Sequence, residues 1–463
     1  MTPARSAIVL GGGLDGIAAA VRLAELGVEV TLLETRKRLG GRATSHLDPA
    51  TGELIDNCQH VVLGCCTNLL DLYQRLDSTL AIEWHDRMYF ADKQGRRWTF
   101  TDAPLPAPLH LSRALLGYKG LSLGDRLHIG RTMGAMMRAR RGEFETITFG
   151  VYLDRRRTSA LAIDRFWNPI VRSACNLPVE TVSAASAMQV FQQGFMAHRD
   201  GWRLGTATIA LADLYEHTEP ILKDSGGKVR TGTGVASLCA DGPRVTGVMT
   251  TQGESINADV VISALPADRL AKVASDALRE VDPRLAALDR IDTSPIIGMH
   301  LWLDRPVLTT PNLFFTDGAI DWLFAAPHQP TDGTQHLHTG ISAAQDRVGM
   351  ATDDMLEMAM GELRAYAEAL PGAAGAKLLR GHVIREKRAT FAATPGIDAL
   401  RPATVGSTTN LLLAGDWTAT GWPSTMEGAV RSGYAAAGAA VGRDLRVADL
   451  PPALLYRLLT RRG

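Results

Sequence analysis

Residues 7–34, AIVLGGGLDGIAAAVRLAELGVEVTLLE, decide the fold. The segment begins with an apolar strand, turns at three glycines and continues as an amphipathic helix, in which Ile17, Val21 and Ala24 recur at helical spacing. Gly27 stands where such a helix would end, and a second apolar strand follows. The segment therefore predicts a βαβ unit, the start of a layered α/β domain.

Three glycines in this turn have a spacing typical of dinucleotide binding. Gly11, Gly13 and Gly16 form a G-x-G-x-x-G pattern, which allows a tight turn, close approach to a pyrophosphate and close packing of helix on strand. The helix N-terminus would then face the phosphates. Glu34 ends the second strand, where a carboxylate can accept hydrogen bonds from a ribose diol.

Length and composition narrow the class of protein. A chain of 463 residues suggests roughly two or three domains. The 49 basic residues balance the 49 acidic ones, so overall charge gives no indication of a nucleic-acid partner. The number of cysteines, five, is odd, and the first strand starts too early for a cleavable leader, so we expect a reduced, cytoplasmic protein. No apolar run reaches the ~18 residues of a spanning helix, so we expect no integral membrane segment.

An acidic residue lies inside the predicted phosphate loop. Asp15 would repel a pyrophosphate if its side chain pointed inward. The motif Leu39-Gly40-Gly41-Arg42 follows the second strand, and Arg42 could supply the compensating cation. The alternative for Arg42 is an ordinary solvated loop charge.

Both ends of the chain resemble one family. Residues 11–43, GGGLDGIAAAVRLAELGVEVTLLETRKRLGGRA, are similar to the N-terminal signature of FAD-dependent amine oxidases and phytoene desaturases. Residues 410–437, NLLLAGDWTATGWPSTMEGAVRSGYAAA, resemble the C-terminal flavin motif of these proteins. The resemblance implies FAD as cofactor, with Gly415 and Asp416 near its ribityl or phosphate part. It also implies that the amides around Met426 and Glu427 face the pyrimidine edge of the flavin.

Residues 226–266 alternate like β-strands and break at glycines. They resemble the segment of this superfamily that returns to the FAD domain, which implies Val235 near the adenine. Gly232-Thr233-Gly234 lacks the third glycine and the helix of a second dinucleotide site. We therefore expect an α/β fold, a Rossmann-type, GR2-like FAD-binding domain with an inserted α+β substrate domain. The predicted bounds are 1–100, 220–290 and 395–443 for the FAD domain, 101–219 and 291–394 for the substrate domain, and 444–463 for a tail.

The segment from Leu105 to Arg141 is strongly basic. It contains a single acid, Asp125, among leucines, methionines and the basic residues Arg113, Lys119, Arg126, Arg131, Arg138, Arg140 and Arg141. Such a pattern is typical of a helical surface that lies on anionic lipid, or of a solvated basic face above an ordinary core.

Residues 56–66, DNCQHVVLGCC, combine three cysteines with a histidine. Zinc ligation or a redox dithiol would require Cys-x-x-Cys spacings that the chain does not show, so we predict no metal site and expect Cys65 and Cys66 to pack as small apolar residues. The segment resembles hydroxysqualene dehydroxylases of hopanoid synthesis, also called squalene-associated FAD-dependent desaturases, in which glycine usually stands in place of Cys58. The resemblance implies that this segment is a wall beside the flavin, with Gln59 and His60 as its polar members.

The reaction of that family replaces an allylic hydroxyl of hydroxysqualene by hydride from reduced FAD and releases squalene and water. Such a reaction needs a general acid for the leaving hydroxyl and aromatic faces near the developing cation. His60 is the first candidate acid and Asp321 the second. The candidate walls of the substrate site are Trp322, Trp417 and Trp422, with Trp167 and Phe315 as weaker candidates.

Three other functions are compatible with the residues: a carotenoid or phytoene desaturase, an amine oxidase, and a non-enzymatic, FAD-stabilised scaffold for a terpene synthase complex. The expected partners are a long-chain isoprenoid substrate, an anionic membrane surface and synthases of the squalene pathway. We expect a peripheral location on the cytoplasmic face of the inner membrane.

Overall fold

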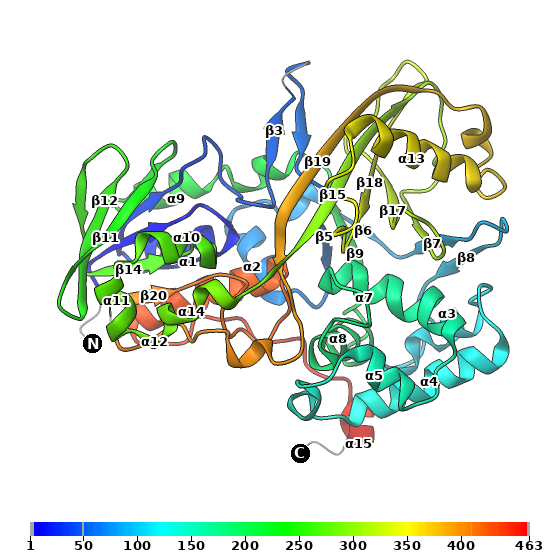
Figure 1. Ribbon diagram of the computed structural model, residues 1–463, viewed down its shortest axis with the longest axis horizontal. Helices are drawn as coiled ribbons and strands as arrows, with labels where there is room; N and C mark the ends of the chain where they lie inside the picture. Colours follow the sequence, from blue (N-terminus) through cyan, green and yellow to red (C-terminus); the bar gives the residue numbers. More distant parts are fainter. Residues whose placement is uncertain (1–3, 49–50, 409, 461–463) are drawn as a thin grey trace.

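The computed structural model describes residues 4–48, 51–408 and 410–460, so the last residues of the predicted tail lie outside it. Its nucleotide-binding lobe is built on a five-stranded parallel sheet, at the left of Figure 1. The strands in spatial order are β10 (Lys228–Arg230), β2 (Glu29–Leu33), β1 (Ser6–Leu10), β14 (Val260–Ser263) and β20 (Leu411–Leu413). Strands from three distant parts of the chain therefore make one sheet, which confirms the predicted Rossmann-type fold.

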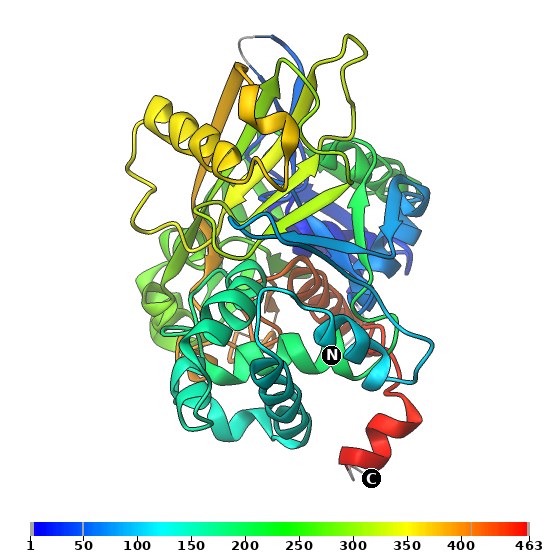
Figure 2. The same cartoon turned by 90° about the vertical axis from the view of Figure 1, so that its right-hand side faces the viewer.

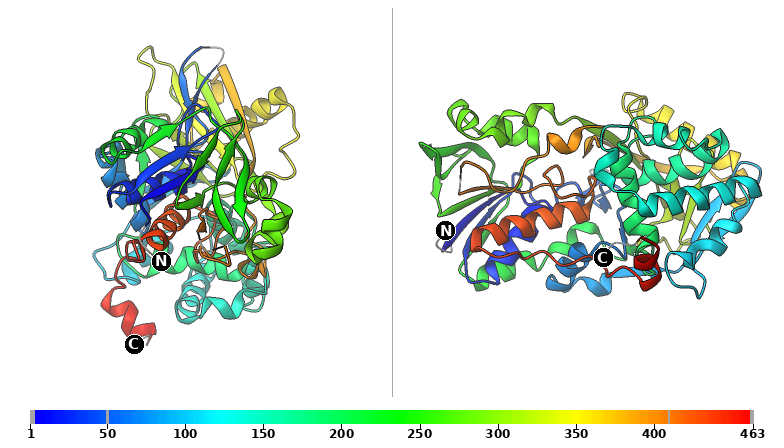
Figure 3. Two further views of the ribbon diagram at one scale, coloured as in Figure 1. Left: turned by 90° about the vertical axis from the view of Figure 1, so that its left-hand side faces the viewer. Right: turned by 90° about the horizontal axis from the view of Figure 1, so that it is seen from below.

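Alternating side chains give this sheet two apolar faces. Ala7 and Val9 of β1 pack under helices α1 (Leu14–Ala24) and α14 (Met426–Val441), which lie side by side below the sheet in Figure 3. Ile8 and Leu10 face the opposite core, which includes β11 (Val235–Asp241) and β12 (Arg244–Thr250) of an antiparallel sheet completed by β13 (Ser255–Asn257). Burial on both faces explains the nearly continuous apolar sequence of these strands.

The second lobe is built on a seven-stranded sheet. Its strands in spatial order are β19 (Leu378–Phe391), β15 (Thr293–Leu303), β18 (Gln335–Ile341), β17 (Trp322–Ala325), β16 (Asn312–Phe315), β7 (Met88–Ala91) and β8 (Arg97–Phe100). Helix α13 (Thr352–Ala365) packs on one face of the sheet. Because β7 pairs with β16, β7 and β8 belong to this sheet, although the predicted nucleotide domain extended to residue 100. Such non-local pairing leaves no local signal in the sequence.

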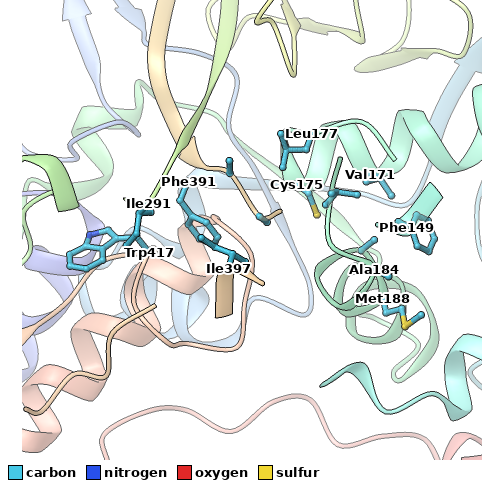
Figure 4. Packing of buried hydrophobic residues seen from close by; sticks show 14 of the residues in the cluster. Phe149, Val171, Cys175, Leu177, Ala184, Met188, Ile291, Phe391, Ile397 and Trp417 are labelled. Carbon is cyan, nitrogen blue, oxygen red and sulfur yellow. The ribbon is translucent and has the colours of Figure 1, made fainter. Parts of the chain in front are cut away.

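Helices fill the space below the second sheet (Figure 2). Figure 4 shows their core, which runs from Phe149 and Met188 to Trp417 beside the nucleotide lobe. The remaining helices are α2 (Thr67–Arg75), α3 (Ser112–Leu116), α4 (Leu123–Arg138), α5 (Phe149–Asp154), α6 (Ala160–Ala162), α7 (Asn168–Cys175), α8 (Ala184–Gln189), α9 (Thr218–Asp224), α10 (Ala267–Val273), α11 (Asp276–Val281), α12 (Pro283–Ala286) and α15 (Leu454–Thr460). Three short strands form a further sheet, in the order β5 (Val61–Leu63), β9 (Leu204–Ala207) and β6 (Ile82–His85), and β3 (Ser45–Leu47) pairs with β4 (Leu54–Asp56).

Among the described residues, no helix combines the length and the apolar character that crossing a bilayer would require.

Candidate active site

The glycine turn between β1 and α1 fits a diphosphate because side chains cannot enter it. Gly11 has a φ of +101°, and a Cβ at this position would lie 2.7 Å from the carbonyl oxygen of Ala264. A Cβ at Gly16 would lie 1.9 Å from the carbonyl oxygen of Gly11. Gly13 caps α1 without a side-chain hydrogen bond, and the carboxyl group of Asp15 accepts from the amides of Asp15 and Gly16 in the first turn. The predicted phosphate loop is therefore sterically built for backbone contact with a ligand.

Glu34 lies at the end of β2, beside this turn. One carboxylate oxygen accepts from the Gly12 amide at 2.7 Å and the other accepts from the Arg36 amide at 2.7 Å. The amide of Thr233 donates to the carbonyl of Glu34 at 2.9 Å, which brings the start of β11 and Val235 to the same edge. The side chain expected at the ribose and the residue expected at the adenine are thus adjacent in the fold.

Four side chains form a polar cluster next to the glycine turn. Arg42 lies 2.5 Å from Asp416 and also donates to the carbonyl of Ala389 at 2.7 Å. Ser424 donates to the other carboxylate oxygen of Asp416. Burial, reinforced by repulsion from Asp416 and opposed by Arg42, raises the pKa of Asp15 to about 7. The raised pKa means that Asp15 is protonated below neutral pH, which reduces the charge conflict that its position in the phosphate loop suggested.

Glu427 has a structural function that sequence reasoning missed. Its side chain is completely buried and accepts from the backbone amides of Asn68 and Leu69, at the N-terminus of α2. Arg431, one turn later in α14, pairs with it at 2.6 Å. The Glu427–Arg431 spacing was a visible signal of an ion pair within a helix. The carboxylate thus holds α2 to α14, while the α14 N-terminus, capped by Thr425, faces the loop after β20.

The stretch 56–66 lies where the two lobes meet. The amide of Leu211 donates to Asp56 of β4 at 3.0 Å, and the Gln59 side chain reaches His338 in the second sheet at 3.0 Å. His60 Nδ1 lies 2.8 Å from the carbonyl of Cys58, and burial lowers the pKa of this imidazole. A neutral ring that donates from Nδ1 presents Nε2 as an acceptor.

The cysteines of this stretch are free thiols, as are Cys175 and Cys239. Cys65 is buried and Cys66 partly buried. Burial raises the pKa of Cys58 to about 12, so its thiol is protonated at neutral pH and behaves as a small apolar group.

An aromatic cluster adjoins this stretch. It contains the buried residues Met88, Leu111, Trp202, Leu204, Trp322 and Phe324, and its partly buried members include Cys58, Val61, Leu63, Phe90, Phe100, Phe195 and Phe314. The rings of Trp322 and Phe324 lie 5.4 Å apart at a steep angle. A Cβ at Gly340 would lie 2.7 Å from the Trp322 ring, so this glycine makes room for it. The aromatic cluster thus forms an apolar environment beside the stretch 56–66.

The three tryptophans predicted to line the substrate site lie in different surroundings. Trp322 belongs to the aromatic cluster, whereas Trp417 donates to the carbonyl of Leu265 at 3.2 Å and packs in the core shown in Figure 4. Trp422 lies under the guanidinium of Arg431, 4.8 Å from its ring centroid. Among the weaker candidates, Trp167 is buried in the helical core and Phe315 packs under α13. Of these five predicted candidates, only Trp322 lies in the aromatic cluster.

Asp321 immediately precedes Trp322 at the start of β17. Its side chain is 11% exposed, accepts from the Ser342 amide at 2.6 Å and lies 3.5 Å from Arg172. Burial raises the pKa of Asp321, although the positive charge of Arg172 opposes the shift. A carboxyl group with a raised pKa is a better proton donor near neutral pH than an ordinary aspartate.

Comparison with known proteins agrees with these features. Residues 16–441 match the family model described as flavin containing amine oxidoreductase. The chain is 30% identical to a hydroxysqualene dehydroxylase of Rhodopseudomonas palustris, over 93% of this chain and 96% of the relative. It is 24% identical to a 15-cis-phytoene desaturase of Synechococcus elongatus, over 94% and 96% of the two chains. The structure of an oxidoreductase from Methanosarcina mazei superposes with a TM-score of 0.71 at 18% identity, over 92% and 98%.

The glycine turn at the start of α1 and the acceptor Glu34 fit the diphosphate and ribose of FAD. The chain therefore belongs to the flavin-containing amine oxidoreductase family, as an FAD-dependent oxidoreductase.

Proposed function

We propose that this enzyme reduces hydroxysqualene to squalene with loss of water. The observation that carries the proposal is the position of Asp321: a buried carboxyl group next to Trp322, whose aromatic cluster includes Cys58 and Val61 of the stretch after the Gly-Gly-Arg motif. A proton donor beside an apolar, aromatic surface is what removal of an allylic hydroxyl requires. The relative from R. palustris is named for this reaction and aligns over most of the chain.

The reaction needs a proton, a hydride and an apolar site. FAD, when bound and reduced, supplies the hydride that joins the allylic carbon. Asp321 donates a proton to the hydroxyl oxygen as the carbon–oxygen bond breaks, and water leaves. The Ser342 amide and Arg172 stabilise the carboxylate that remains, because one donates a hydrogen bond to it and the other is a cation.

His60 is less suited to proton donation than Asp321. Its Nδ1 hydrogen is engaged by the carbonyl of Cys58, so Nε2 could donate only from the doubly protonated ring. Burial lowers the pKa of that ring and disfavours the charged form. We therefore assign His60 the task of fixing the wall beside the flavin and Asp321 the task of the acid.

The aromatic cluster serves the substrate in two ways. Its rings can stabilise an allylic cation through their negative faces. Its apolar side chains can hold a long isoprenoid chain out of water, which places one carbon for hydride transfer. Besides burial, repulsion from Asp321 contributes to the raised pKa of Cys58, a member of this cluster, which supports a position of the acid near the aromatic surface.

Product formation tests the proposed function. Reduced enzyme, incubated anaerobically with hydroxysqualene, should form squalene, which gas chromatography separates from the substrate. Asp321→Asn should slow this conversion by about 10² to 10⁴, the usual range for loss of general acid catalysis, while FAD is retained. Asp346→Asn, an exposed change in the same lobe, is the matched control and should leave the rate unchanged.

The phytoene desaturase relative supports a second candidate function, oxidation of a polyene. Formation of a desaturated product from phytoene, with no squalene from hydroxysqualene, would replace the proposed function by this one.

We further propose that the enzyme works on a membrane surface, which suits a product of negligible solubility in water. The basic segment 105–141 carries leucines that are 41% to 60% exposed: Leu105, Leu109, Leu116, Leu123 and Leu127. Helix α15 contacts α4, through Arg138 and the carbonyl of Leu459, and adds the exposed Leu454 and Leu458 to this region. Cationic side chains beside exposed leucines match the headgroups and the acyl boundary of a bilayer.

Sedimentation with liposomes tests this location. Binding to anionic vesicles should exceed binding to neutral vesicles and should fall as salt is added, because screening weakens attraction beyond about 8 Å at physiological ionic strength. The double variant Leu123→Ser, Leu127→Ser should reduce binding to both kinds of vesicle. Equal binding to anionic and neutral vesicles would contradict the electrostatic part of the proposal.

A further inference from the structure

Three histidines converge on one face of the second sheet. His300 of β15 is directly paired with His338 of β18, and His336 lies two residues before His338 and therefore on the same face. One ring nitrogen from each histidine lies within 4.8 Å of the other two. The alternate residues Leu301 and Leu337 point to the opposite face, into the core under α13. The cluster thus faces away from that helix, toward the stretch around Asp56 and Gln59.

Hydrogen bonds from outside the cluster orient two of the rings. His300 Nε2 lies 2.9 Å from the carbonyl oxygen of Asp56, which can only accept, so this nitrogen carries the hydrogen. His338 Nδ1 lies 3.0 Å from Gln59 Oε1, while the amide nitrogen of Gln59 donates to the carbonyl of His60. His338 Nδ1 therefore also donates. The bonds leave a lone pair on Nδ1 of His300 and on Nε2 of His338.

This pattern is the one that metal-binding histidines show, in which one ring nitrogen donates to a carbonyl or carboxylate and the other binds the ion. His336 Nε2 donates a hydrogen bond to His300 Nδ1 at 3.1 Å. Two nitrogens at about 2.0 to 2.1 Å from a tetrahedral zinc ion would be separated by roughly 3.3 Å, so the two rings are already spaced for one ion. To bind it, His336 must move its hydrogen from Nε2 to Nδ1, and the ring of His338 must approach by a rotation.

A tryptophan and an arginine flank the cluster on the side of β19. Trp302 stacks on His336 with ring centroids 4.0 Å apart, and Arg380 lies over the other side of Trp302. The charge of Arg380 is balanced by Asp48 and Glu53, both of which pair with it.

We propose that His300, His336 and His338 form a binding site for a first-row divalent cation, with Zn²⁺ as the best match, held by three imidazole nitrogens. Imidazole is a preferred ligand for zinc, copper and nickel, and three protein ligands leave a fourth position for water. Because Asp56 and Gln59 orient two of the ligands, the ion would fasten the second sheet to the stretch 56–59. This site departs from the expectation of no metal, which considered cysteine spacings. The pattern His336-Leu337-His338 in an apolar strand was the signal for it.

Metal titration of the untagged holoenzyme tests the site. After dialysis against a chelator, the protein should bind one equivalent of Zn²⁺, measured by calorimetry and by metal analysis. Co²⁺ in the same site should give the visible ligand-field bands of a tetrahedral centre, read as a difference spectrum against the cobalt-free holoenzyme. Both measurements are made on the wild-type chain, and neither depends on the proposed reaction.

Substitutions locate the ion. His336→Leu should abolish saturable binding, and Gln59→Leu should weaken it by about 10- to 100-fold, as loss of an orienting partner does elsewhere. The control is His85→Leu, which removes a buried histidine bonded to Thr206 in a different sheet, and it should bind zinc like the wild type. Absence of cobalt bands and of saturable zinc uptake in the wild type would overturn the proposal. Unchanged affinity in a folded, flavin-containing His336→Leu variant would do the same.

Discussion

The glycine turn of the nucleotide lobe and the aromatic cluster of the second lobe are built in different ways. The turn depends on backbone geometry within a few consecutive residues, because a Cβ at Gly16 would lie 1.9 Å from the carbonyl oxygen of Gly11. The aromatic cluster is assembled from β5, β7, β9 and β17, which are spread between residues 61 and 325 of the chain. One site is specified locally and the other by tertiary packing.

The difference predicts different sensitivity to substitution. A locally specified turn has no freedom to adjust, because its constraints are covalently close and involve backbone atoms. A packed apolar surface tolerates volume changes at a moderate cost and changes its ligand preference with its shape. Cofactor binding and substrate binding should therefore be separable by single substitutions.

The largest effect is expected at the glycine turn. In Gly16→Ala the new methyl group would collide with the carbonyl oxygen of Gly11, so the turn must open and FAD should be lost almost completely. The flavin absorbance of the purified protein measures this. Gly361→Ala in α13 is the matched control, because nothing lies within 4 Å of a Cβ there. It should retain FAD and gain up to about 1 kcal/mol of stability from the higher helix propensity of alanine. A full flavin content in Gly16→Ala would contradict the claim that the glycine turn cannot adjust to a side chain.

A pair of tryptophan substitutions sharpens the contrast between the lobes. Trp322→Ala and Trp417→Ala each remove a buried ring and should each lower the free energy of unfolding by about 3 to 5 kcal/mol. Trp322→Ala should impair binding of the isoprenoid substrate with FAD retained. Trp417→Ala should impair FAD retention, because its ring packs on Gly415 and bonds Leu265. Steady-state kinetics and flavin content distinguish the two outcomes, and identical profiles for both variants would contradict the assignment.

The smallest effect concerns pH. The pKa of Asp15 is about 7 in the folded protein against an ordinary value of 3.8, so the folded state binds the proton more tightly than the unfolded chain. The free energy of unfolding should therefore fall as the pH rises from about 4 to about 7. The diphosphate of FAD should raise this pKa further, so flavin should also dissociate more readily above neutral pH. Asp15→Asn should flatten both profiles, measured by thermal unfolding and flavin release, whereas the exposed Asp224→Asn should not.

The same contrast explains what the sequence could predict. Gly11, Gly13, Gly16 and Glu34 were predictable because steric and hydrogen-bonding requirements act within one βαβ unit. The function of Glu427 at the start of α2 depends on a partner that is 359 positions away, and the sequence does not reveal that contact. For the same reason, the sequence could not predict that Trp322, Trp417 and Trp422 lie in different surroundings. The residue type indicates that a ring is buried, but it does not indicate in which core. The histidine cluster could be predicted only in part. His336 and His338 share one strand and are close in the sequence, whereas His300 joins them through the pairing of β15 with β18.

The direction of electron flow tests the account most directly. Reduced enzyme should be mixed anaerobically with hydroxysqualene in heavy water in a stopped-flow instrument, and the flavin absorbance and the product followed together. The account predicts that the flavin becomes oxidised at the rate at which squalene forms, and that the squalene carries one deuterium at the former hydroxyl carbon. Flavin that stays reduced with hydroxysqualene, while phytoene or squalene reduces the oxidised enzyme, would contradict reductive dehydroxylation and establish a desaturase.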